Sequence, residues 1–508
     1  MKKCLKNIKN ILSIMLIAAM MLTFMASCQT GGENENKDNQ DGNVSENLDQ
    51  ADDSEQIETT EAPIYPELEA KDFGGYEFTF LTRTSDSIDW TEWEHRDLYA
   101  EEETGDIIND SVYKRNSKIE EKYNIKISEV KVTDFSGTVR KTVNAGDDVY
   151  DVVLPHLMEV AALAQNGSIM DIFQVPYLDF DKPWWNQNCP RDLSIGNKLF
   201  TMQGDLLILD NDAMEAMIFN KAILQDHALE NPYDIVKRGE WTFEKLYDMS
   251  KGVSKDLNGD GEMYIKDDLF GCILQADTDI SFLVSGGDKI VSKDQNDYPV
   301  ITFGSDRTYR ITDAISRLML DEENVVNLHR YEGKFGIYDE QVKMMQENRA
   351  LFSWIRMRIV ERLRSMETDF GILPLPKLDK DQPKYITHNN PHTGVGISIP
   401  QTASDLERTG MILEDLSAES RYTLQPAYHE INLRGKFARD DESQEMLDII
   451  LDNTAYEIGY IYNFGGFSMT IVYNGMNKST AYASQFEKME TRMQKDIDKT
   501  IEAYENIE

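Results

Sequence analysis

An acidic loop in the middle of the chain has the residue spacing of a calcium-binding site. Residues 256–262 read D-L-N-G-D-G-E, which matches the first half of the EF-hand loop, D-x-N-x-D-G. Oxygen atoms at positions 1, 3 and 5 of such a loop converge because the glycine at position 6 permits a sharp turn, and position 7 contributes a backbone carbonyl. Position 12 holds an aspartate where an EF-hand has glutamate, and a second aspartate follows, so either carboxylate could close the site. The candidate ligands of a structural Ca²⁺ are Asp256, Asn258, Asp260, Glu262, Asp267 and Asp268. A solvated acidic turn without metal is the alternative.

The common catalytic signatures are missing from the sequence. It contains no H-E-x-x-H, no G-x-S-x-G and no glycine-rich phosphate loop. Paired carboxylates could serve a glycosidase, but among 91 acidic residues some pair always looks suitable. We therefore expect no enzyme activity and no catalytic cofactor.

The N-terminus has the pattern of an export signal. Residues 1–10 carry four lysines and no acidic residue, and the fourteen residues from Ile11 to Phe24 are almost entirely apolar. A membrane-spanning helix needs about 20 apolar residues, so this segment is short for a permanent anchor. The sequence M-A-S-C that follows resembles the bacterial lipoprotein box, which implies that Cys28 is lipid-modified and that residues 1–28 form a lipoprotein signal peptide. A plain cleavage site with a free cysteine is the alternative.

The composition changes sharply after the cysteine. Residues 29–70 hold 13 acidic residues and one lysine, with too few apolar residues to bury a core, so we expect a disordered acidic tether. The whole chain of 508 residues has a net charge of −39. That balance argues against nucleic acid and against strongly anionic ligands, because phosphate contacts need clustered lysine and arginine.

The remaining sequence alternates strands with helices. Strands are expected at 76–81, 125–130, 149–154, 370–376 and 395–400, and helices at 107–123, about 138–144, about 403–416 and from about 475 onward. This alternation predicts βαβ units and a mainly parallel sheet. Open sheets of this kind bind ligands at the carboxyl ends of their strands. His156, just after 149–154, is therefore a candidate hydrogen-bonding residue, with a helix cap as the alternative.

Five segments in order resemble the extracellular solute-binding proteins of ABC importers, the group that includes maltose-binding protein. They are 145–153 with 163–171, the I-F-N-K turn at 218–221, 231–234 with 239–243, the G-I-L-P-L-P strand within 369–376, and 426–428 with 441–450. The resemblance implies an α/β fold of the type II periplasmic-binding-protein kind, with two hinge-connected lobes and a ligand cleft between them. By analogy, lobe one takes residues 71–212 plus about 397–425, and lobe two takes 213–396 plus about 426–508.

The resemblance also implies a function. The protein would be a monomeric, lipid-anchored protein on the extracellular face of the cell membrane. It would capture a small solute, which we expect to be an oligosaccharide, and pass it to the transmembrane subunits of an ABC permease. A secreted carbohydrate-active hydrolase and a surface adhesin are the alternatives, although the sequence has neither the repeats nor the β-sandwich pattern that an adhesin favours.

Sugar clefts need flat aromatic faces and polar rims, which suggests several ligand-binding residues. Trp184 and Trp185 stand in a polar, loop-like stretch, with anchoring of that loop on the core as the alternative. The resemblance adds Trp354 and Arg356 on the second lobe and Asn211 and Asp212 at the first crossing. The remaining candidates are His388 and Tyr428. Cys189 and Cys272 could form a disulfide or remain two buried thiols, and sequence alone gives no distance between them.

Overall fold

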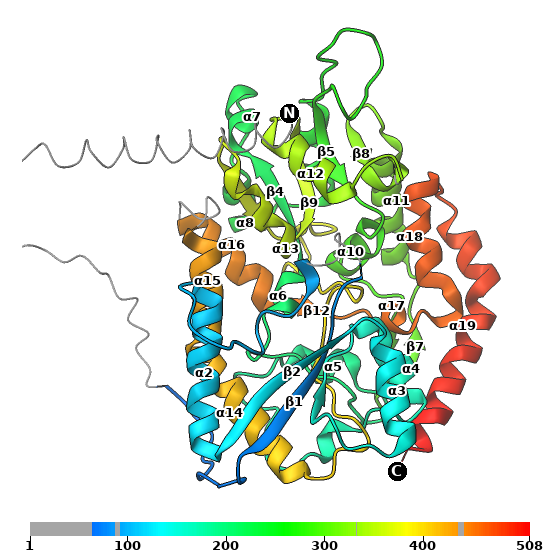
Figure 1. The fold of residues 1–508 in the computed structure, drawn as a ribbon. Helices are drawn as coiled ribbons and strands as arrows, with labels where there is room; N and C mark the ends of the chain where they lie inside the picture. The colour runs from blue at the N-terminus through cyan, green and yellow to red at the C-terminus, as the bar shows by residue number, and fades with distance from the viewer. Residues whose placement is uncertain (1–62, 87–91, 332, 435–440, 508) are drawn as a thin grey trace, which may run out of the picture. The chain divides into compact units, whose positions relative to one another are not determined.

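The computed structural model describes residues 63–507 except 87–91, 332 and 435–440. The export signal, Cys28 and residues 29–62 of the expected tether lie outside the described residues. Residues Pro63–Glu508 form one compact unit. This unit is built around two larger β-sheets and the helices that cover them (Figure 1).

Residues 64 and 65, within the expected tether, contact the folded body. Tyr65 packs against Tyr422 with ring centroids 5.2 Å apart, and Lys118 lies over the Tyr65 ring at 4.9 Å. The backbone N–H of Ile64 donates to the Tyr422 hydroxyl at 2.8 Å. These contacts hold Ile64 and Tyr65 against Lys118 and Tyr422, and the extent of the tether stays a prediction.

The first sheet has three parallel strands in the order β2-β1-β3. Its strands are β1 (Tyr76–Arg83), β2 (Ile125–Val132) and β3 (Val152–Val153). Helix α2 (Ile107–Tyr123) connects β1 to β2, and α3 (Phe135–Ala145) connects β2 to β3. Parallel neighbours need such crossovers, so the βαβ order expected from the sequence is confirmed here.

The expected strand at 395–400 joins this sheet only through single bridges. Ser398 pairs antiparallel with Val153, and Ile397 pairs antiparallel with Met202. Two different neighbours therefore share one short segment, and no regular ladder forms. Gly396 allows the close approach, since a Cβ there would lie 2.1 Å from the hydroxyl oxygen of Thr201.

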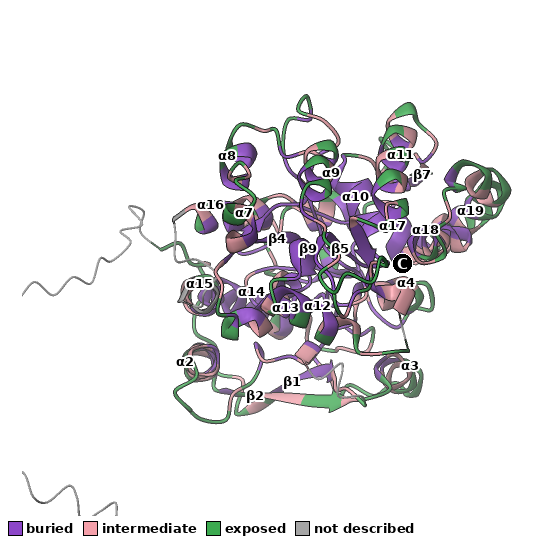
Figure 2. Ribbon diagram, turned by 90° about the horizontal axis from the view of Figure 1, so that it is seen from above, coloured by how far each residue is buried: buried purple, intermediate pink, exposed green. Residues whose placement is uncertain are grey.

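The second sheet is mixed rather than mainly parallel. Its order is β10-β4-β9-β5-β8. The strands are β4 (Glu215–Asn220), β5 (Phe270–Leu274), β8 (Val325–Asn327), β9 (Ala350–Arg356) and β10 (Phe370–Leu373). Strand β5 runs parallel to both β8 and β9, whereas β4 runs antiparallel to both β9 and β10. Every residue of β4, β5 and β9 is buried, and Figure 2 shows these strands covered by helices.

Helices cover both sheets. Those that follow β3 in the sequence, up to residue 285, are α4 (Leu157–Gln165), α5 (Asn188–Leu193), α6 (Leu209–Asp212), α7 (Lys221–Asp226), α8 (Pro232–Lys237), α9 (Phe243–Lys251) and α10 (Thr278–Ser285). Those that follow are α11 (Asp306–Leu320), α12 (Ile337–Gln346), α13 (Met357–Val360), α14 (Leu406–Tyr422), α15 (Leu424–Arg434), α16 (Asp441–Asp452), α17 (Ile458–Tyr462), α18 (Phe467–Asn477) and α19 (Tyr482–Glu505). Single 3-10 turns lie at Ile172–Gln174, Leu328–Tyr331, Glu361–Ser365 and Phe464–Gly466.

Two short strand pairs complete the fold. The pair β6 (Val291–Lys293) and β7 (Pro299–Ile301) is antiparallel, whereas β11 (Thr387–His388) and β12 (Thr454–Ala455) are parallel. Because β12 follows α16, the β11–β12 pair joins the C-terminal helices to the segment that returns from the second sheet.

The C-terminal helices divide between the two sheets. Helices α14 and α15 pack against α2, and Ala427 and Tyr428 of α15 share a buried apolar cluster with Ile108 and Val112 of α2. Helix α16 packs against β10, and α18 packs against α10 and α19. The exact extent of each lobe stays a prediction.

Candidate functional site

A cavity of about 270 Å³ lies at the carboxyl ends of the three parallel strands of the first sheet. Strand β1 ends at Arg83, β2 ends just before Thr133, and β3 leads into His156. The wall is completed by a segment after β1 and by one residue of the link that returns from the second sheet. The lining residues are Arg83, Thr84, Ser85, Asp86, Trp93, Glu94, Thr133, His156 and His392. This is the edge at which open α/β sheets bind ligands.

Trp93 supplies the aromatic surface of this cavity. Its side chain is 5% exposed, and its indole Nε1–H has no hydrogen-bond partner in the described part of the chain. The guanidinium carbon of Arg356 lies 6.0 Å from the Trp93 ring. Sequence reasoning missed Trp93, which lies well beyond the carboxyl end of β1.

Two histidines face the cavity from different parts of the chain. His156 is the N-cap residue of α4, as the helix-cap alternative expected, and its backbone N–H donates to the Glu159 carboxylate at 3.1 Å. Burial lowers the pKa of His156 to about 4, and its Nδ1 has no partner among the described residues. Burial also lowers the pKa of His392, against the opposing charge of Asp277. Both imidazoles are therefore neutral at pH 7, and each can donate one hydrogen bond and accept another.

Charged residues at the cavity are held by neighbours. Arg83 pairs with Glu159 and donates to the Thr133 carbonyl, which leaves its Nε–H without a partner in the described structure. Glu94 accepts from the Thr84 hydroxyl at 3.0 Å and from the Ser85 N–H at 2.8 Å. The fixed carboxylates limit the positive charge that the cavity presents.

The three tryptophans suggested by the sequence lie in the core. Trp184 and Trp354 are 0% exposed and Trp185 is 3% exposed. The indole N–H of Trp185 donates to Glu414 at 2.9 Å, and its ring packs edge-on against Phe180. None of the three lines the cavity. The loop-anchoring alternative for Trp184 and Trp185 describes these surroundings, and a role of either ring in binding stays a prediction.

Asn211, Asp212 and Tyr428 form part of a polar network at the chain crossing. Asp212, 2% exposed, accepts from the Tyr428 hydroxyl at 3.1 Å and lies 3.3 Å from Arg96 and 3.6 Å from Arg358. Asn211 donates to Gln425 at 3.1 Å. These contacts hold the crossing in place, and none of the three predicted residues lines the cavity.

Arg356 and His388 are buried next to the cavity rather than in its wall. Arg356 donates to the carboxylate of Asp277. His388 Nδ1 lies 2.8 Å from Glu215, a carboxylate that is 0% exposed. Of the nine predicted ligand-binding residues, the structure therefore brings only His156 to the cavity wall.

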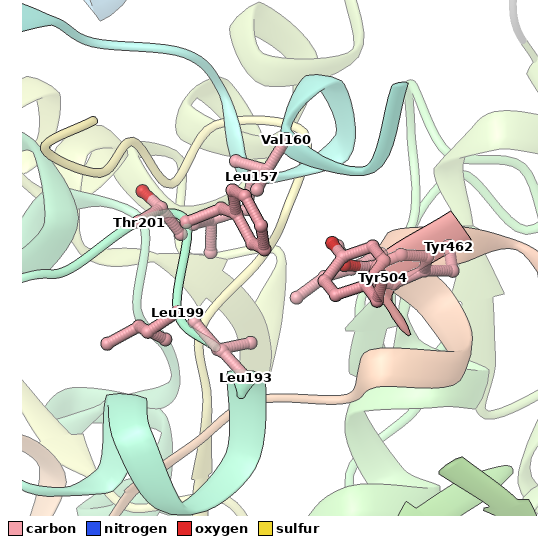
Figure 3. A pocket seen from close by; sticks show the side chains of 9 residues that line it. Leu157, Val160, Leu193, Leu199, Thr201, Tyr462 and Tyr504 are labelled. Carbon is pink, nitrogen blue, oxygen red and sulfur yellow. The ribbon is translucent and has the colours of Figure 1, made fainter. Parts of the chain in front are cut away.

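A second, much smaller cavity lies between α4 and the C-terminal helices. Figure 3 shows the rings of Tyr462 and Tyr504 on one side and Leu157 and Val160 of α4 on the other. Its volume of about 10 Å³ holds at most one water molecule. It is a packing defect and cannot accept a solute.

The acidic loop at 256–268 has the turn geometry that the sequence predicted. The Asp256 carboxylate accepts from the N–H groups of Gly259 and Gly261, which lowers its pKa, and Gly261 has a positive φ of 87°. The Asp268 carboxylate is occupied by the N–H groups of Leu257 and Tyr264. Asp267 is exposed. Among the described residues no three His, Cys, Asp or Glu side chains are grouped to hold a metal ion. The first half of the loop fits Ca²⁺, the closing carboxylate is not in place, and the calcium site stays a prediction.

The two folded-body cysteines are separate buried thiols. Cys189 lies in α5 and Cys272 in β5, and neither forms a disulfide. Burial raises the pKa of Cys189 to about 12 and that of Cys272 further. Neither thiol is therefore a reactive nucleophile.

Comparison with solved structures defines the class of fold. The chain superposes on a cyclo/maltodextrin-binding protein complexed with maltotetraose with a TM-score of 0.53 at 12% identity, covering 84% of this chain and 97% of that one. An ABC substrate-binding protein from Listeria monocytogenes, in complex with cycloalternan, gives 0.51 at 11% identity, with 84% and 99% covered. UspC of M. tuberculosis gives 0.52 at 11% identity, with 83% and 100% covered.

The fold is therefore the two-lobed α/β fold of type II periplasmic-binding proteins, as the sequence resemblance implied. At 11% and 12% identity, the likeness to the two sugar complexes is a likeness of fold. No sequence-family profile and no curated protein matches the chain. Among the described helices, none is both long and apolar enough to cross a membrane.

Proposed function

We propose that the protein is the substrate-binding component of an ABC importer and that it captures a neutral carbohydrate in the cavity at the end of the first sheet. The fold supports this proposal, and two of the similar structures are complexes with maltotetraose and with cycloalternan. The expected role of a binding protein, rather than an enzyme, agrees with the nature of these neighbours.

The observation that carries the proposal is a set of buried polar atoms without partners on residues of the cavity wall. They are Trp93 Nε1, Arg83 Nε and His156 Nδ1, all unpaired within the described structure. Buried polar atoms are usually hydrogen-bonded. Other unpartnered atoms occur elsewhere in the described structure, such as the Nε1 atoms of Trp184 and Trp354, but these three belong to residues of one cavity wall. Sugar hydroxyls, which accept and donate, would satisfy all three after small side-chain movements. The Trp93 ring would pack against the apolar face of a pyranose.

The charges favour an uncharged solute. His156 and His392 are neutral at pH 7 because burial lowers their pKa values. Arg83 is paired with Glu159, and Asp86 and Glu94 lie in the same wall. Together with a net charge of −39 on the whole chain, these carboxylates would repel an anionic solute.

Capture would work by closure of the lobes. A solute can shift the balance toward the closed state only if it binds that state more tightly. The composition of the cavity wall supports this mechanism, because the wall combines strand ends of the first sheet with His392, which lies on the segment returning from the second sheet. The closed complex would then deliver its solute, chemically unchanged, to the permease.

Anchoring of the protein is part of the same proposal. The protein would be a monomer. Lipid on Cys28 would anchor it at the extracellular face of the membrane, and residues 29–62 would link the anchor to the folded body. A flexible coil of that length spans about 30 Å. The solved neighbours do not favour the alternatives, a carbohydrate-active hydrolase or a surface adhesin.

The test is a thermal-shift screen of the protein against neutral mono- and oligosaccharides, followed by calorimetry. A true ligand at about 100 times its Kd adds about 2.7 kcal/mol to the free energy of unfolding. Trp93→Ala should abolish the shift, whereas Trp185→Phe, in the core, should preserve it. Product analysis of the same mixtures distinguishes capture from hydrolysis. The proposal fails if no sugar binds, if Trp93→Ala binds as the wild type does, or if the sugar is cleaved.

A further inference from the structure

A buried arginine stands at the centre of three aromatic rings beside the cavity. The guanidinium carbon of Arg356 lies 6.0 Å from the centroid of Trp93, 5.7 Å from that of Trp354 and 6.0 Å from that of Tyr338. Arg356 ends β9 of the second sheet, whereas Trp93 belongs to the segment after β1 of the first sheet. The cation therefore connects the aromatic wall of the cavity to the second sheet.

A chain of hydrogen bonds continues from this arginine to the opposite wall. Arg356 donates to the Asp277 carboxylate. The Asn390 amide donates to the same carboxylate at 3.1 Å, and its oxygen accepts from the backbone N–H of His392 at 3.0 Å. Trp93 and His392, at the two ends of this chain, both line the cavity.

The chain is enclosed, and Arg356 and Asp277 in it are both charged. Arg356 is 5% exposed, Asp277 8% and Asn390 0%. Burial opposes both charges, but the attraction of Tyr338 and Asp277 raises the pKa of Arg356, and Arg356 lowers that of Asp277. A desolvated cation–π contact is stronger than an exposed one, so Arg356 can hold Trp93 firmly without touching the cavity.

We propose that Arg356, Asp277 and Asn390 form a positioning network that fixes Trp93 relative to His392 and so sets which solutes fit between an aromatic face and an imidazole. Arg356 is thus a positioning residue, not a ligand-contact residue. The part of this inference that concerns solute selection rests on the proposed function, whereas the placement of Trp93 does not.

The first experiment needs no solute. Acrylamide quenching of tryptophan emission is measured on the full chain for wild type, Arg356→Met and Arg356→Lys, each with and without Trp93→Phe. The contribution of Trp93 is the difference that Trp93→Phe makes. We expect Arg356→Met to make Trp93 more accessible to acrylamide, and Arg356→Lys, which keeps the charge but loses the planar group, to restore part of the protection.

The matched control is Arg349→Lys. Arg349 immediately precedes β9 at its other end, is 6% exposed and pairs with Glu347 and Glu340, but it does not contact the cavity wall. It should leave the quenching of Trp93 unchanged. Equal Trp93 quenching in wild type and both Arg356 variants, or an equal change in Arg349→Lys, would overturn the positioning role. If Arg356→Met does not fold, Arg356→Lys provides the same comparison.

The second experiment measures affinity for maltose, for maltotetraose and for any sugar found in the thermal-shift screen. We expect Arg356→Lys to weaken binding about tenfold, with less than a twofold change for Arg349→Lys. Asn390→Ala should weaken binding of the same sugar, because it removes the hydrogen bond that the His392 N–H donates to Asn390. Unchanged affinity in both Arg356→Lys and Asn390→Ala refutes the selective role. If no sugar binds wild type while Trp93 quenching still depends on Arg356, the positioning of Trp93 stands and the proposed function fails.

Discussion

The ion network at the first chain crossing allows a quantitative prediction. Asp212 lies between the guanidinium groups of Arg96, at 3.3 Å, and Arg358, at 3.6 Å. Both arginines also pair with Glu361, at 2.7 Å and 3.0 Å. The network ties the segment that carries Trp93 to α6 and α13. The perturbation is Arg96→Met, which keeps the apolar stem and removes the charge.

The expected loss follows from distance and burial. At an effective dielectric constant of about 20, two unit charges 3.3 Å apart attract by about 5 kcal/mol. Removing one partner of a buried pair costs about 3–5 kcal/mol. Because Arg358 remains beside Asp212 and Arg96 is partly exposed, we expect Arg96→Met to lower the free energy of unfolding by about 2–3 kcal/mol.

Replacing Asp212 should lower the free energy of unfolding much less than replacing Arg96. Burial raises the pKa of Asp212, against the attraction of the two arginines. The folded state therefore favours the neutral form of this group relative to the unfolded state. Asp212→Asn, which is neutral and nearly isosteric, should change the free energy of unfolding by less than about 1 kcal/mol.

Urea denaturation of the full chain at pH 7, followed by tryptophan emission, measures these changes. The control is Lys114→Met, which removes a surface pair with Glu103 at 3.1 Å and should cost less than about 0.5 kcal/mol. The reasoning is refuted if Arg96→Met costs no more than Lys114→Met, or if Asp212→Asn costs more than Arg96→Met.

Three further predictions concern other parts of the chain. Burial raises the pKa of Glu414 to about 7, so its contribution to stability is complete below about pH 4.5 and is lost as the pH rises through 7. Glu414→Gln should therefore raise the free energy of unfolding by about 1–2 kcal/mol at pH 8 and leave it unchanged at pH 4, and an equal effect at both pH values would contradict the assignment. Calcium should raise the melting temperature, and Asp256→Asn should remove that rise; a melting temperature insensitive to both Ca²⁺ and chelator ends the calcium prediction. A radioactive fatty acid should label the protein in cells but not Cys28→Ala, and label that persists in the variant argues against the lipoprotein box.

Local pattern was enough to predict the elements of the first sheet. The helix expected at 107–123 is α2 with the same bounds, because Ile108, Val112 and Ile119 recur at helical spacing and are all buried. Strand β1 begins at Tyr76, as its alternating residues indicated. The mixed direction of the second sheet was not predictable in this way, since β4, β9 and β10 are buried on both faces and their sequences do not record the direction of a neighbour.

The candidate binding residues divide along the same line. The rule that ligands meet the carboxyl ends of parallel strands placed His156 at the cavity wall from sequence alone, whereas Trp93 lies too far beyond the end of β1 for that rule to single it out. Trp184, Trp185 and Trp354 looked suitable because of residue type. Their burial depends on which distant segments pack over them, and nothing local to each residue records that.

The sequence by itself determined an acidic α/β chain and the strand edge at which a ligand is expected, because periodicity and composition are properties of neighbouring residues. The tertiary structure decided which aromatic ring reaches that edge and what holds it there. Trp93, Arg356, Asp277 and His392 come from four separate parts of the chain, and only the packing of the two sheets brings them together.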